Sequence, residues 1–303
     1  MKLDGKKILV TGATGMVGKP IAEALAGRSE VIAAARFKDP DAKDELEKAG
    51  VRCVSADLMS GDLSGLPDVD VVVHLGVVKS NKWDKDLDGN AGAVADLMER
   101  YQGVEAFLHC SSGGVYREKG HDPIAETDPL GDNHGVMPFM ATYSISKIAA
   151  EAVARWGARR FRIPTVITRL SVPYGDNGGW PHVHLQMMKA GYPIAVSKDQ
   201  PSQYNPIHTD DMVAMLPTLL GAASVPATTI NWGGDEVVSI EDWVAYLSDI
   251  TGLEAKVTPS DEALPSVVVD LAKQAALGLH STIPWRDGVR RMVAATEPDL
   301  LKP

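Results

Sequence analysis

Tyr143 and Lys147 are the residues whose types and spacing most directly suggest chemistry in this sequence. They lie four residues apart in the run ATYSISKIAAE, so on a helix both side chains would share one face. An ammonium group beside a phenol favours the phenolate, and we expect it to lower the tyrosine pKa, ordinarily about 10, toward the range of an acid/base catalyst. An exposed helix pair has the same spacing, so the pair predicts a site only together with other features.

A glycine-rich run, TGATGMVG, follows a strand predicted at Lys7–Val10 and precedes a helical pattern. Gly12 would permit a tight turn, and Gly15 would let the backbone approach a pyrophosphate. Gly18 would let the helix pack close to the strand, with its first amides facing the phosphates. Such a turn on the first strand predicts a dinucleotide cofactor. The other candidate contacts in the turn are Thr14, Met16 and Val17.

The end of the second predicted strand indicates which dinucleotide is bound. An acid there would accept hydrogen bonds from the ribose hydroxyls of NAD, whereas an arginine suits the 2′-phosphate of NADP. This sequence has Ala34 and Ala35, then Arg36, with Lys38 two residues further on. The missing acid and the two cations favour NADP over NAD, although an arginine after a strand is also common as a solvated surface charge.

Apolar runs alternate with helical patterns along the first two thirds of the chain, which predicts an α/β Rossmann-type fold, a doubly wound parallel sheet. The predicted strands are Ile8–Val10, Val31–Ala35, Val51–Ser55, Val69–Leu75, Ala106–Ser111 and Pro164–Leu170. The predicted helices are Lys19–Ala26, Asp41–Ala49, Asn90–Tyr101, Thr142–Ala158, Ile240–Thr251 and one near Asp287–Ala295. We expect a cofactor-binding domain at residues 1–172 and a smaller substrate lobe at 173–303, partly interleaved with the sheet.

Composition narrows the class of partner. The chain has 303 residues, of which 45% are hydrophobic, and a formal net charge of -10. Such an acidic chain is not expected to bind nucleic acid or an anionic membrane, so we expect a small-molecule partner. No apolar run is long enough to span a bilayer, and the first strand begins within about six residues. These features predict a cytoplasmic protein in which Cys53 and Cys110 are reduced and buried.

Two further positions complete the candidate site. Ser112 lies at the carboxyl end of a predicted strand, in the run SSGGVY, where open α/β sheets bind ligands. Its hydroxyl could hydrogen-bond a substrate oxygen whose charge changes during hydride transfer, although serines at strand ends often only turn the chain. Asn90 begins a predicted helix, and an N-cap would explain it equally well.

Together these residues resemble the extended short-chain dehydrogenase/reductase family, the NAD-dependent epimerase/dehydratase group, over nearly the whole chain. The runs that carry the resemblance are TGATGMVG, SADL with Asp57, HLG at 74–76, Asn90 with its helix, SSGGVY at 111–116, YSISK at 143–147, TRLSVPYG at 168–175 and NPIHTDDM at 205–212.

The resemblance implies a role for each matching residue. Ser112 matches the catalytic Ser or Thr, Tyr143 the proton donor or acceptor, and Lys147 the residue that binds the nicotinamide ribose and lowers the tyrosine pKa. Asn90 matches an asparagine behind the helix that carries the tyrosine, and His208 matches a loop-fixing position. The implied cofactor contacts outside the glycine turn are Arg36, Asp57, Leu58, Leu75, Gly76, Lys147 and Val172.

Departures from the family pattern narrow the activity. The Asp-Glu pair with which 4,6-dehydratases eliminate water is replaced by Gly113 and Gly114. Two diphosphate anchors of UDP-sugar epimerases are also missing, since Val172 replaces an asparagine and no arginine precedes IHTDD. The glycines would leave space beside Ser112 for a bulky, cyclic or aromatic substrate. The candidate substrate contacts are Ser112, Gly113, Tyr143, Trp83 and Trp180, and no metal is expected at His182 and His184, because no third ligand lies at suitable spacing.

The sequence therefore predicts an NAD(P)-dependent oxidoreductase that moves a hydride between nicotinamide and an alcohol or carbonyl carbon, by Ser-Tyr-Lys catalysis. A nucleotide-sugar 4-epimerase that keeps its cofactor bound is the main alternative. A non-catalytic NADP(H) sensor is a second alternative, although such proteins usually lose the tyrosine or the lysine. Similarity to the family also implies a homodimer formed through the helices at Asn90–Tyr101 and Thr142–Ala158.

Overall fold

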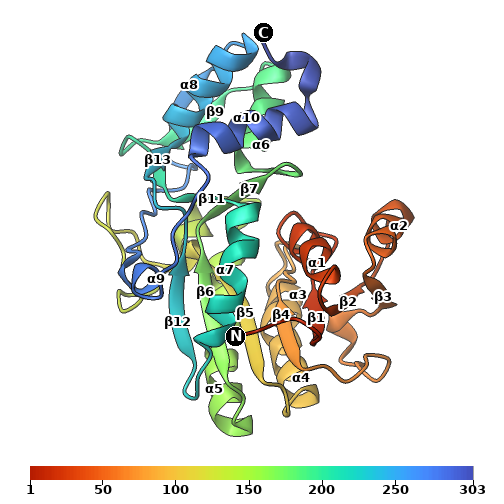
Figure 1. Cartoon of the computed structure of the whole chain (residues 1–303). Helices are drawn as coiled ribbons and strands as arrows, with labels where there is room; N and C mark the ends of the chain where they lie inside the picture. The colour runs from red at the N-terminus through yellow and green to blue at the C-terminus, as the bar shows by residue number, and fades with distance from the viewer. Residues whose placement is uncertain (303) are drawn as a thin grey trace. The chain divides into compact units, whose positions relative to one another are not determined.

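A computed structural model describes residues 1–302 of the chain, which divide into two compact units (Figure 1). Unit 1 comprises Met1–Ser112, Thr142–Arg169 and Val213–Ile230. Unit 2 comprises Gly113–Ala141, Leu170–Met212 and the chain from Asn231 onward. The chain thus passes between the units repeatedly, and the domain boundary expected after residue 172 stays a prediction.

A seven-stranded sheet forms the centre of unit 1, in the order β12-β6-β5-β4-β1-β2-β3. The strands are β1 (Lys7–Thr11), β2 (Glu30–Ala35), β3 (Arg52–Ser55), β4 (Val71–His74), β5 (Ala106–Ser112), β6 (Thr165–Leu170) and β12 (Thr228–Trp232). β1 pairs in parallel with both β2 and β4. Strands β1 to β3 follow one another toward one edge of the sheet, and the next strand, β4, lies on the other side of β1. The carboxyl ends of β1 and β4 therefore border the switch point where such sheets bind ligands. The predicted Rossmann-type fold is confirmed.

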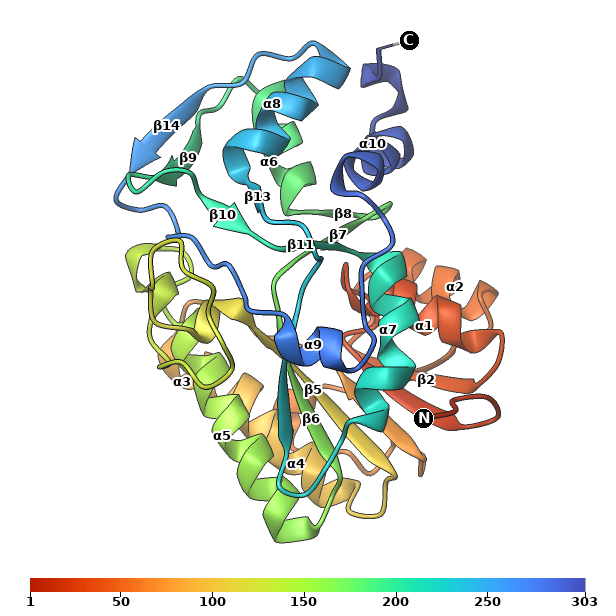
Figure 2. The ribbon, with the colours of Figure 1, turned by 60° about the vertical axis from the view of Figure 1, so that its left-hand side comes forward.

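Helices cover both faces of this sheet (Figure 2). One face carries α1 (Gly18–Ala26), α2 (Pro40–Lys48) and α7 (Thr209–Gly221), and the other carries α3 (Trp83–Leu87), α4 (Ala93–Arg100) and α5 (Tyr143–Phe161). The inner strands are apolar on consecutive residues because both of their faces are covered. In β4, for example, every side chain from Val71 to His74 is buried.

Unit 2 contains three small sheets, ordered β10-β13, β11-β7-β8 and β14-β9. Their strands are β7 (Val172–Gly175), β8 (Gly178–Gly179), β9 (Ile194–Ser197), β10 (Gln203–Tyr204), β11 (Pro206–His208), β13 (Val238–Ser239) and β14 (Val257–Ser260). The helices of the unit are α6 (Trp180–Lys189), α8 (Ile240–Thr251), α9 (Ala272–Ala276) and α10 (Trp285–Thr296). A capping box between Ser239 and Asp242 starts α8, and Gly252 in the left-handed conformation ends it.

The helix predicted at Asn90–Tyr101 begins later than expected. After α3, residues Asp88–Gly92 form a π-helical turn, and α4 starts only at Ala93. Asn90 therefore lies inside the turn and is not an N-cap. Within residues 1–302, we find no helix with the length and apolar character needed to cross a membrane.

Candidate active site

The glycine-rich turn after β1 has the close backbone approach that its sequence predicts. Gly12 has a positive φ of 70°, and a Cβ atom there would lie 2.8 Å from the backbone nitrogen of Gly76. A Cβ atom on Gly18 would lie 2.2 Å from the carbonyl oxygen of Gly12. Neither position accepts a side chain, so the first amides of α1 stay close to the end of β1, as a phosphate-binding turn requires.

A pocket of about 420 Å³ lies beside this turn, at the carboxyl ends of β1 to β4. Its size and its position at the switch point fit a dinucleotide. The predicted cofactor contacts that line it are Gly12, Thr14, Gly15, Arg36, Asp57, Leu58, Leu75 and Gly76. Of the others, Met16 and Val17 continue the turn into α1, and Val172 is buried in the core of unit 2.

The rim of this pocket at the end of β2 carries both predicted cations and one acid. Arg36 and Lys38 line the pocket, as expected for residues that face a 2′-phosphate. Asp39, which no sequence motif marked, lines it as well. Its carboxylate accepts a hydrogen bond of 3.1 Å from the backbone N–H of Asp41 and so caps α2. The first acid after the carboxyl end of β2 therefore already accepts a hydrogen bond from the backbone.

The hydroxyl groups of Ser112 and Tyr143 are hydrogen-bonded to each other. Ser112 ends β5 and Tyr143 begins α5, so the pair joins the carboxyl end of a central strand to the amino end of the helix that packs beside it. A substrate oxygen in contact with both hydroxyls could exchange a proton with Tyr143 while Ser112 holds it in place. The structure thus brings together two of the three predicted catalytic side chains.

Lys147, the third, is buried one helical turn along α5 and donates a hydrogen bond of 2.6 Å to the carbonyl oxygen of Cys110. Burial lowers the pKa of Lys147. The lowered pKa predicted for Tyr143 is wrong for this structure, because burial raises the pKa of Tyr143 and the hydrogen bond with Ser112 opposes that only in part. Desolvation of the phenol dominates, and the Lys147 ammonium is directed at a backbone carbonyl.

Asn90 connects the loop after β4 to the helix that carries the catalytic residues. Its side-chain oxygen accepts a hydrogen bond of 3.0 Å from the backbone N–H of Val78, and its amide donates one of 2.9 Å to the carbonyl of Val78. The amide also donates to the hydroxyl of Ser146, at 3.2 Å. Asn90 therefore fixes α5 next to Lys147 from behind, which agrees with the position that the family resemblance implies.

Asp86, which no sequence motif identified, connects the loop after β4 to the residue that precedes α5. Its carboxylate accepts hydrogen bonds from the Thr142 hydroxyl at 2.6 Å and from the Ser80 hydroxyl at 2.6 Å. Burial alone would raise the pKa of Asp86, but these hydrogen bonds bring the pKa below its ordinary value. Because Thr142 directly precedes Tyr143, this buried carboxylate fixes the start of α5.

Lys79 is a second site residue that sequence reasoning missed. Its ammonium lies over the ring of Tyr143, with Nζ 5.5 Å from the ring centre. Although much of the side chain is exposed, partial burial lowers the pKa of Lys79. A cation over an aromatic face is attracted to it by about 0.5–1 kcal/mol at an exposed site. The only signal in the sequence was a lysine in the loop that follows the switch-point strand.

A buried ion pair anchors the middle of α5 to β6. Both nitrogens Nε and Nη2 of Arg169 donate to the carboxylate of Glu151, at 2.9 and 2.8 Å. Arg155 adds a third hydrogen bond to the same carboxylate, at 2.7 Å. Glu151 is fully buried, and the hydrogen bonds and charge of Arg169 outweigh burial and lower the pKa of its carboxyl. Such bidentate pairing fixes the helix against the strand.

Two buried histidines on neighbouring strands stand next to the cofactor pocket. The rings of His74 and His109 are stacked, with centres 5.4 Å apart. The Thr11 hydroxyl shares a hydrogen bond of 2.7 Å with Nδ1 of His74, and its oxygen also accepts one of 3.2 Å from the N–H of Gly76. Burial lowers the pKa of His74 to about 3 and that of His109 well below its ordinary value. Both rings are therefore neutral near pH 7.

The candidate substrate contacts lie in different surroundings. A Cβ atom on Gly113 would lie 3.3 Å from Cγ1 of Val267 and 3.8 Å from Cγ1 of Val269, and the space expected beside Ser112 stays a prediction. Trp180 packs in an aromatic cluster with its ring centre 5.0 Å from that of Tyr204. Trp83 is 49% exposed at the start of α3. Substrate contact by either tryptophan stays a prediction.

His184 and His208 have structural partners. Nδ1 of His184 accepts a hydrogen bond of 2.9 Å from the indole of Trp243. His208 accepts one of 3.1 Å from the backbone N–H of Asp210, as expected for a loop-fixing residue. In the part of the chain that the structure describes, no group of three or more His, Cys, Asp or Glu side chains is placed to hold a metal ion.

Known proteins that are similar to this chain in sequence or fold include epimerases and reductases of nucleotide sugars. The sequence is 26% identical over 278 residues to an uncharacterized UDP-glucose epimerase of Bacillus subtilis, covering 84% of this chain and 85% of that one. It is 26% identical over 313 residues to a dTDP-4-dehydro-6-deoxy-D-allose reductase of Streptomyces, covering 94% of each. The structure of UDP-glucuronic acid 4-epimerase from Bacillus cereus, in complex with UDP-glucuronic acid and NAD, matches with a TM-score of 0.77 and 25% identity over 95% of this chain and 98% of that one.

The family assignment rests on more than half of the chain. Residues 8–233 match the NAD dependent epimerase/dehydratase family, a stretch that includes the glycine turn, Ser112, Tyr143 and Lys147. The relatives are both epimerases and sugar reductases, and these activities share a nicotinamide cofactor and a hydride step. The chain is an NAD(P)-dependent enzyme of the NAD-dependent epimerase/dehydratase family, the extended short-chain dehydrogenases/reductases.

Proposed function

We propose that the enzyme catalyses hydride transfer between NAD(P) and an alcohol or carbonyl carbon of a small, cyclic, hydroxylated substrate. The observation that carries this proposal is the hydrogen bond between the hydroxyls of Ser112 and Tyr143 at the carboxyl end of β5. This pair can act on one substrate oxygen, and the glycine-lined pocket in the same unit fits the dinucleotide.

Each catalytic residue has a separate part in this proposal. Tyr143 takes the hydroxyl proton of an alcohol or gives a proton to the oxygen of a carbonyl. Ser112 donates a hydrogen bond to that oxygen and holds it in line. Lys147 is assigned to bind the ribose of the nicotinamide nucleotide, as the family resemblance implies. The bound cofactor supplies or accepts the hydride, and the residues that would hold it are those that line the pocket at the end of β1 and β2.

NADP is the favoured cofactor in the proposal. Arg36 and Lys38 border the pocket at the end of β2, where a 2′-phosphate would lie. The carboxylate of Asp39, the nearest acid along the chain, is used to cap α2. A soluble cofactor of this kind accords with the predicted cytoplasmic location, and the predicted homodimer through α4 and α5 is also part of the proposal.

A nucleotide-sugar 4-epimerase is the second candidate, because one relative is described as a UDP-glucose epimerase and the matched Bacillus cereus structure as a UDP-glucuronic acid 4-epimerase. Against it, the run before IHTDD, Gln203 to Pro206, has no arginine to hold a diphosphate, and it includes Tyr204. Tyr204 is buried, and its hydroxyl donates to the carbonyl oxygens of Leu264 and Pro265. It therefore offers no positive charge to a diphosphate. A non-catalytic sensor has less support, since Ser112, Tyr143 and Lys147 are all present.

A two-step experiment distinguishes these functions. The purified protein is first heated with NAD, NADP or neither, and we expect NADP to raise its Tm most. It is then incubated with the stabilising nucleotide and a panel of cyclic alcohols, sugars and lactols while nicotinamide absorbance is followed. A net absorbance change supports the oxidoreductase. Cofactor that remains bound through purification, together with interconversion of UDP-sugars and no net absorbance change, would establish the epimerase instead.

A further inference from the structure

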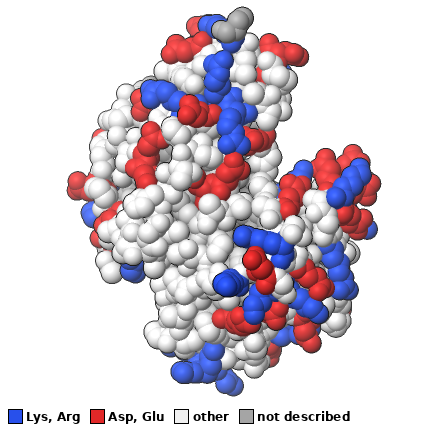
Figure 3. Space-filling view, in the orientation of Figure 1, with Lys and Arg blue, Asp and Glu red and all other residues white. Residues whose placement is uncertain are grey.

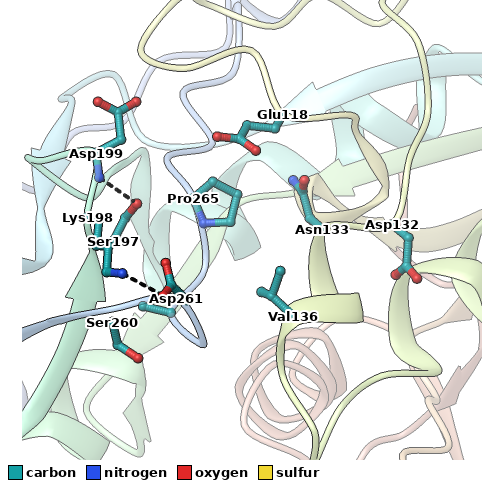
Figure 4. A pocket seen from close by; sticks show the side chains of 11 residues that line it. Glu118, Asp132, Asn133, Val136, Ser197, Lys198, Asp199, Ser260, Asp261 and Pro265 are labelled. Atoms are coloured by element: carbon teal, nitrogen blue, oxygen red, sulfur yellow. Dashed lines mark hydrogen bonds and ion pairs between the residues drawn. The ribbon is translucent and has the colours of Figure 1, made fainter.

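Unit 2 has a pocket of its own, separate in residues from the cofactor pocket and with a volume of about 300 Å³. It lies where two parallel strands end, because β9 and β14 pair with Ser197 opposite Ser260 and both serines line it. Figure 4 shows that loop residues close the opposite side, with Glu118 and Asp132 among them. Carboxyl ends of parallel strands are common ligand sites in α/β proteins.

The charge of this pocket is strongly negative. Its lining contains four carboxylates, those of Glu118, Asp132, Asp199 and Asp261, against the single ammonium of Lys198. Lys198 is already paired with Asp261, at 2.5 Å. The side-chain carboxylates of Glu118 and Asp132 have no hydrogen-bond or ion-pair partner among the described residues, and the Asp132 side chain does not cap the short helix that follows it. The unpaired negative charge in the pocket therefore favours a positively charged ligand.

The pocket also contains a buried polar group without a partner. Asn133 is only 6% exposed, and its side-chain nitrogen has no hydrogen-bond partner within residues 1–302. Figure 4 shows the end of this side chain turned toward the side of the pocket on which Glu118 and Pro265 lie. A buried amide donor is costly to leave unpaired, so a ligand that supplies an acceptor oxygen here would be favoured.

The two serines add hydrogen-bond capacity at the strand ends. The hydroxyl oxygen of Ser197 accepts a hydrogen bond of 3.1 Å from the N–H of Asp199, and that of Ser260 accepts one of 3.1 Å from the N–H of Glu262. Each hydroxyl therefore keeps its O–H free to donate. Together with Asn133, the pocket offers donors for ligand oxygens and carboxylates for ligand N–H and O–H groups.

From these contacts, we propose that the pocket of unit 2 binds a cyclic amine that also carries hydroxyl groups, such as an amino sugar or an aminocyclitol. A metal ion does not fit, because none of the described His, Cys, Asp and Glu side chains form a group of three placed to ligate one. A nucleoside diphosphate does not fit either, since its charge has the same sign as the lining. The volume suits a compact ligand of about one or two rings.

Binding to the full-length protein tests this proposal without any need for catalysis. Calorimetry is performed with 2-deoxystreptamine, which has two amines on a hydroxylated ring. Myo-inositol is the neutral hydroxylated ring, putrescine is the diamine without hydroxyls, and UDP-glucose is the anionic sugar. We expect saturable binding of 2-deoxystreptamine, at least about tenfold tighter than binding of the other three, which weakens as salt is added.

Variants locate the binding to this pocket. The double variant Glu118→Gln with Asp132→Asn keeps side-chain shape and removes the two unpaired charges, and we expect it to weaken 2-deoxystreptamine binding by about tenfold. Asn133→Leu removes only the unpartnered amide and is expected to weaken binding by about fivefold without loss of Tm. Glu254→Gln, a change at an exposed acid elsewhere in unit 2, is the matched control.

Each alternative result overturns the proposal. If myo-inositol or putrescine binds as tightly as 2-deoxystreptamine, the pocket does not require both charge and hydroxyls. If the double variant and the Glu254→Gln control bind alike, the amine binds elsewhere. Failure of hydride transfer leaves these measurements unaffected, because they depend on affinity alone and so remain distinguishable from a failure of the proposed function.

Discussion

At the scale of single residues, the environment of Tyr143 affects how readily its phenol gives up a proton. Burial raises the pKa of the phenol, and the Ser112 hydroxyl opposes this by hydrogen-bonding to it. A phenol that holds its proton is ready to donate it to a carbonyl oxygen, which is the reductive direction. Alcohol oxidation instead needs the phenolate, so it requires higher pH or additional positive charge from Lys147 and Lys79.

The pH profile of alcohol oxidation should report this balance. The rate should rise about tenfold for each pH unit below the pKa of Tyr143, because the active fraction is the phenolate. Ser112→Ala removes the hydrogen bond that lowers the pKa of Tyr143, so the profile should move to higher pH while the maximal rate falls by about 10²-fold. Steady-state rates across neutral and alkaline pH check this, and a Ser112→Ala profile shifted to lower pH would contradict the assignment.

Cofactor choice is also a residue-scale property. Arg36→Ala should raise the KM for NADP by about 10- to 100-fold, because a charge-assisted hydrogen bond to the 2′-phosphate contributes about 1.5–3 kcal/mol. The KM for NAD should change little, since NAD has no phosphate at that position. Initial rates with both cofactors test this, and Lys2→Ala, a change at an exposed lysine that does not line the pocket, serves as the control. Equal effects on both cofactors would show that Arg36 has no part in discrimination.

At the scale of elements, α5 is the part on which the site depends, and it is fixed at three levels. Asp86 binds Thr142 at its start, Asn90 binds Ser146 behind it, and Glu151 binds Arg169 in its middle. The spacing of apolar residues in the sequence predicted α5 and β5 to within a few residues. They did not predict Asp86 or Lys79, because both act through loops whose course depends on tertiary packing rather than on local pattern.

Removing the charge of Glu151 tests the middle attachment. Glu151→Gln should lower the free energy of unfolding by about 3–5 kcal/mol, because it leaves the buried Arg169 guanidinium without a counter-charge. Urea denaturation at neutral pH measures the change. The exposed variant Glu254→Gln should stay within about 0.5 kcal/mol of the parent. A similarly small effect for Glu151→Gln would mean that the ion pair contributes nothing to the stability of α5.

The glycines show where sequence reasoning succeeded and where it failed. Gly12 and Gly18 were predicted from the pattern, since a phosphate turn has few backbone solutions, and the clash distances agree. At Gly113 the pattern did not show that Val267 and Val269, from a distant segment of the sequence, lie within 4 Å of the position of a Cβ atom, and the space expected beside Ser112 stays a prediction. A single sequence does not reveal which remote side chains meet at one point. The same limitation explains why the raised pKa of Tyr143 was not foreseen.

At the scale of the whole molecule, buried neutral histidines make the free energy of unfolding depend on pH. Burial lowers the pKa of His74 to about 3, that of His184 to about 4, and that of His109 well below its ordinary value. In the unfolded chain each histidine takes up a proton below about pH 6.5. Their contribution is therefore fully present above that pH and is lost as pH falls from about 6.5 toward the folded-state values.

Unfolding measured against pH tests this dependence. Each buried histidine should remove up to about 1.4 kcal/mol for each pH unit between about pH 6 and pH 4. His109→Phe should reduce that slope by the contribution of one histidine, since both ring nitrogens of His109 are buried and without a partner in the described chain. An unchanged slope in His109→Phe would contradict burial of a neutral ring. On the face drawn in Figure 3, acidic and basic side chains are interspersed.

The most direct test of the proposed chemistry is Tyr143→Phe, which removes one hydroxyl and keeps the ring under Lys79. The variant should bind the preferred nucleotide with a Kd within about twofold of the parent, because the cofactor pocket is lined by other residues. Its turnover should fall by at least about 10³-fold, since no other group can move the substrate proton. Turnover within about tenfold of the parent, with intact cofactor binding, would contradict the catalytic role of Tyr143.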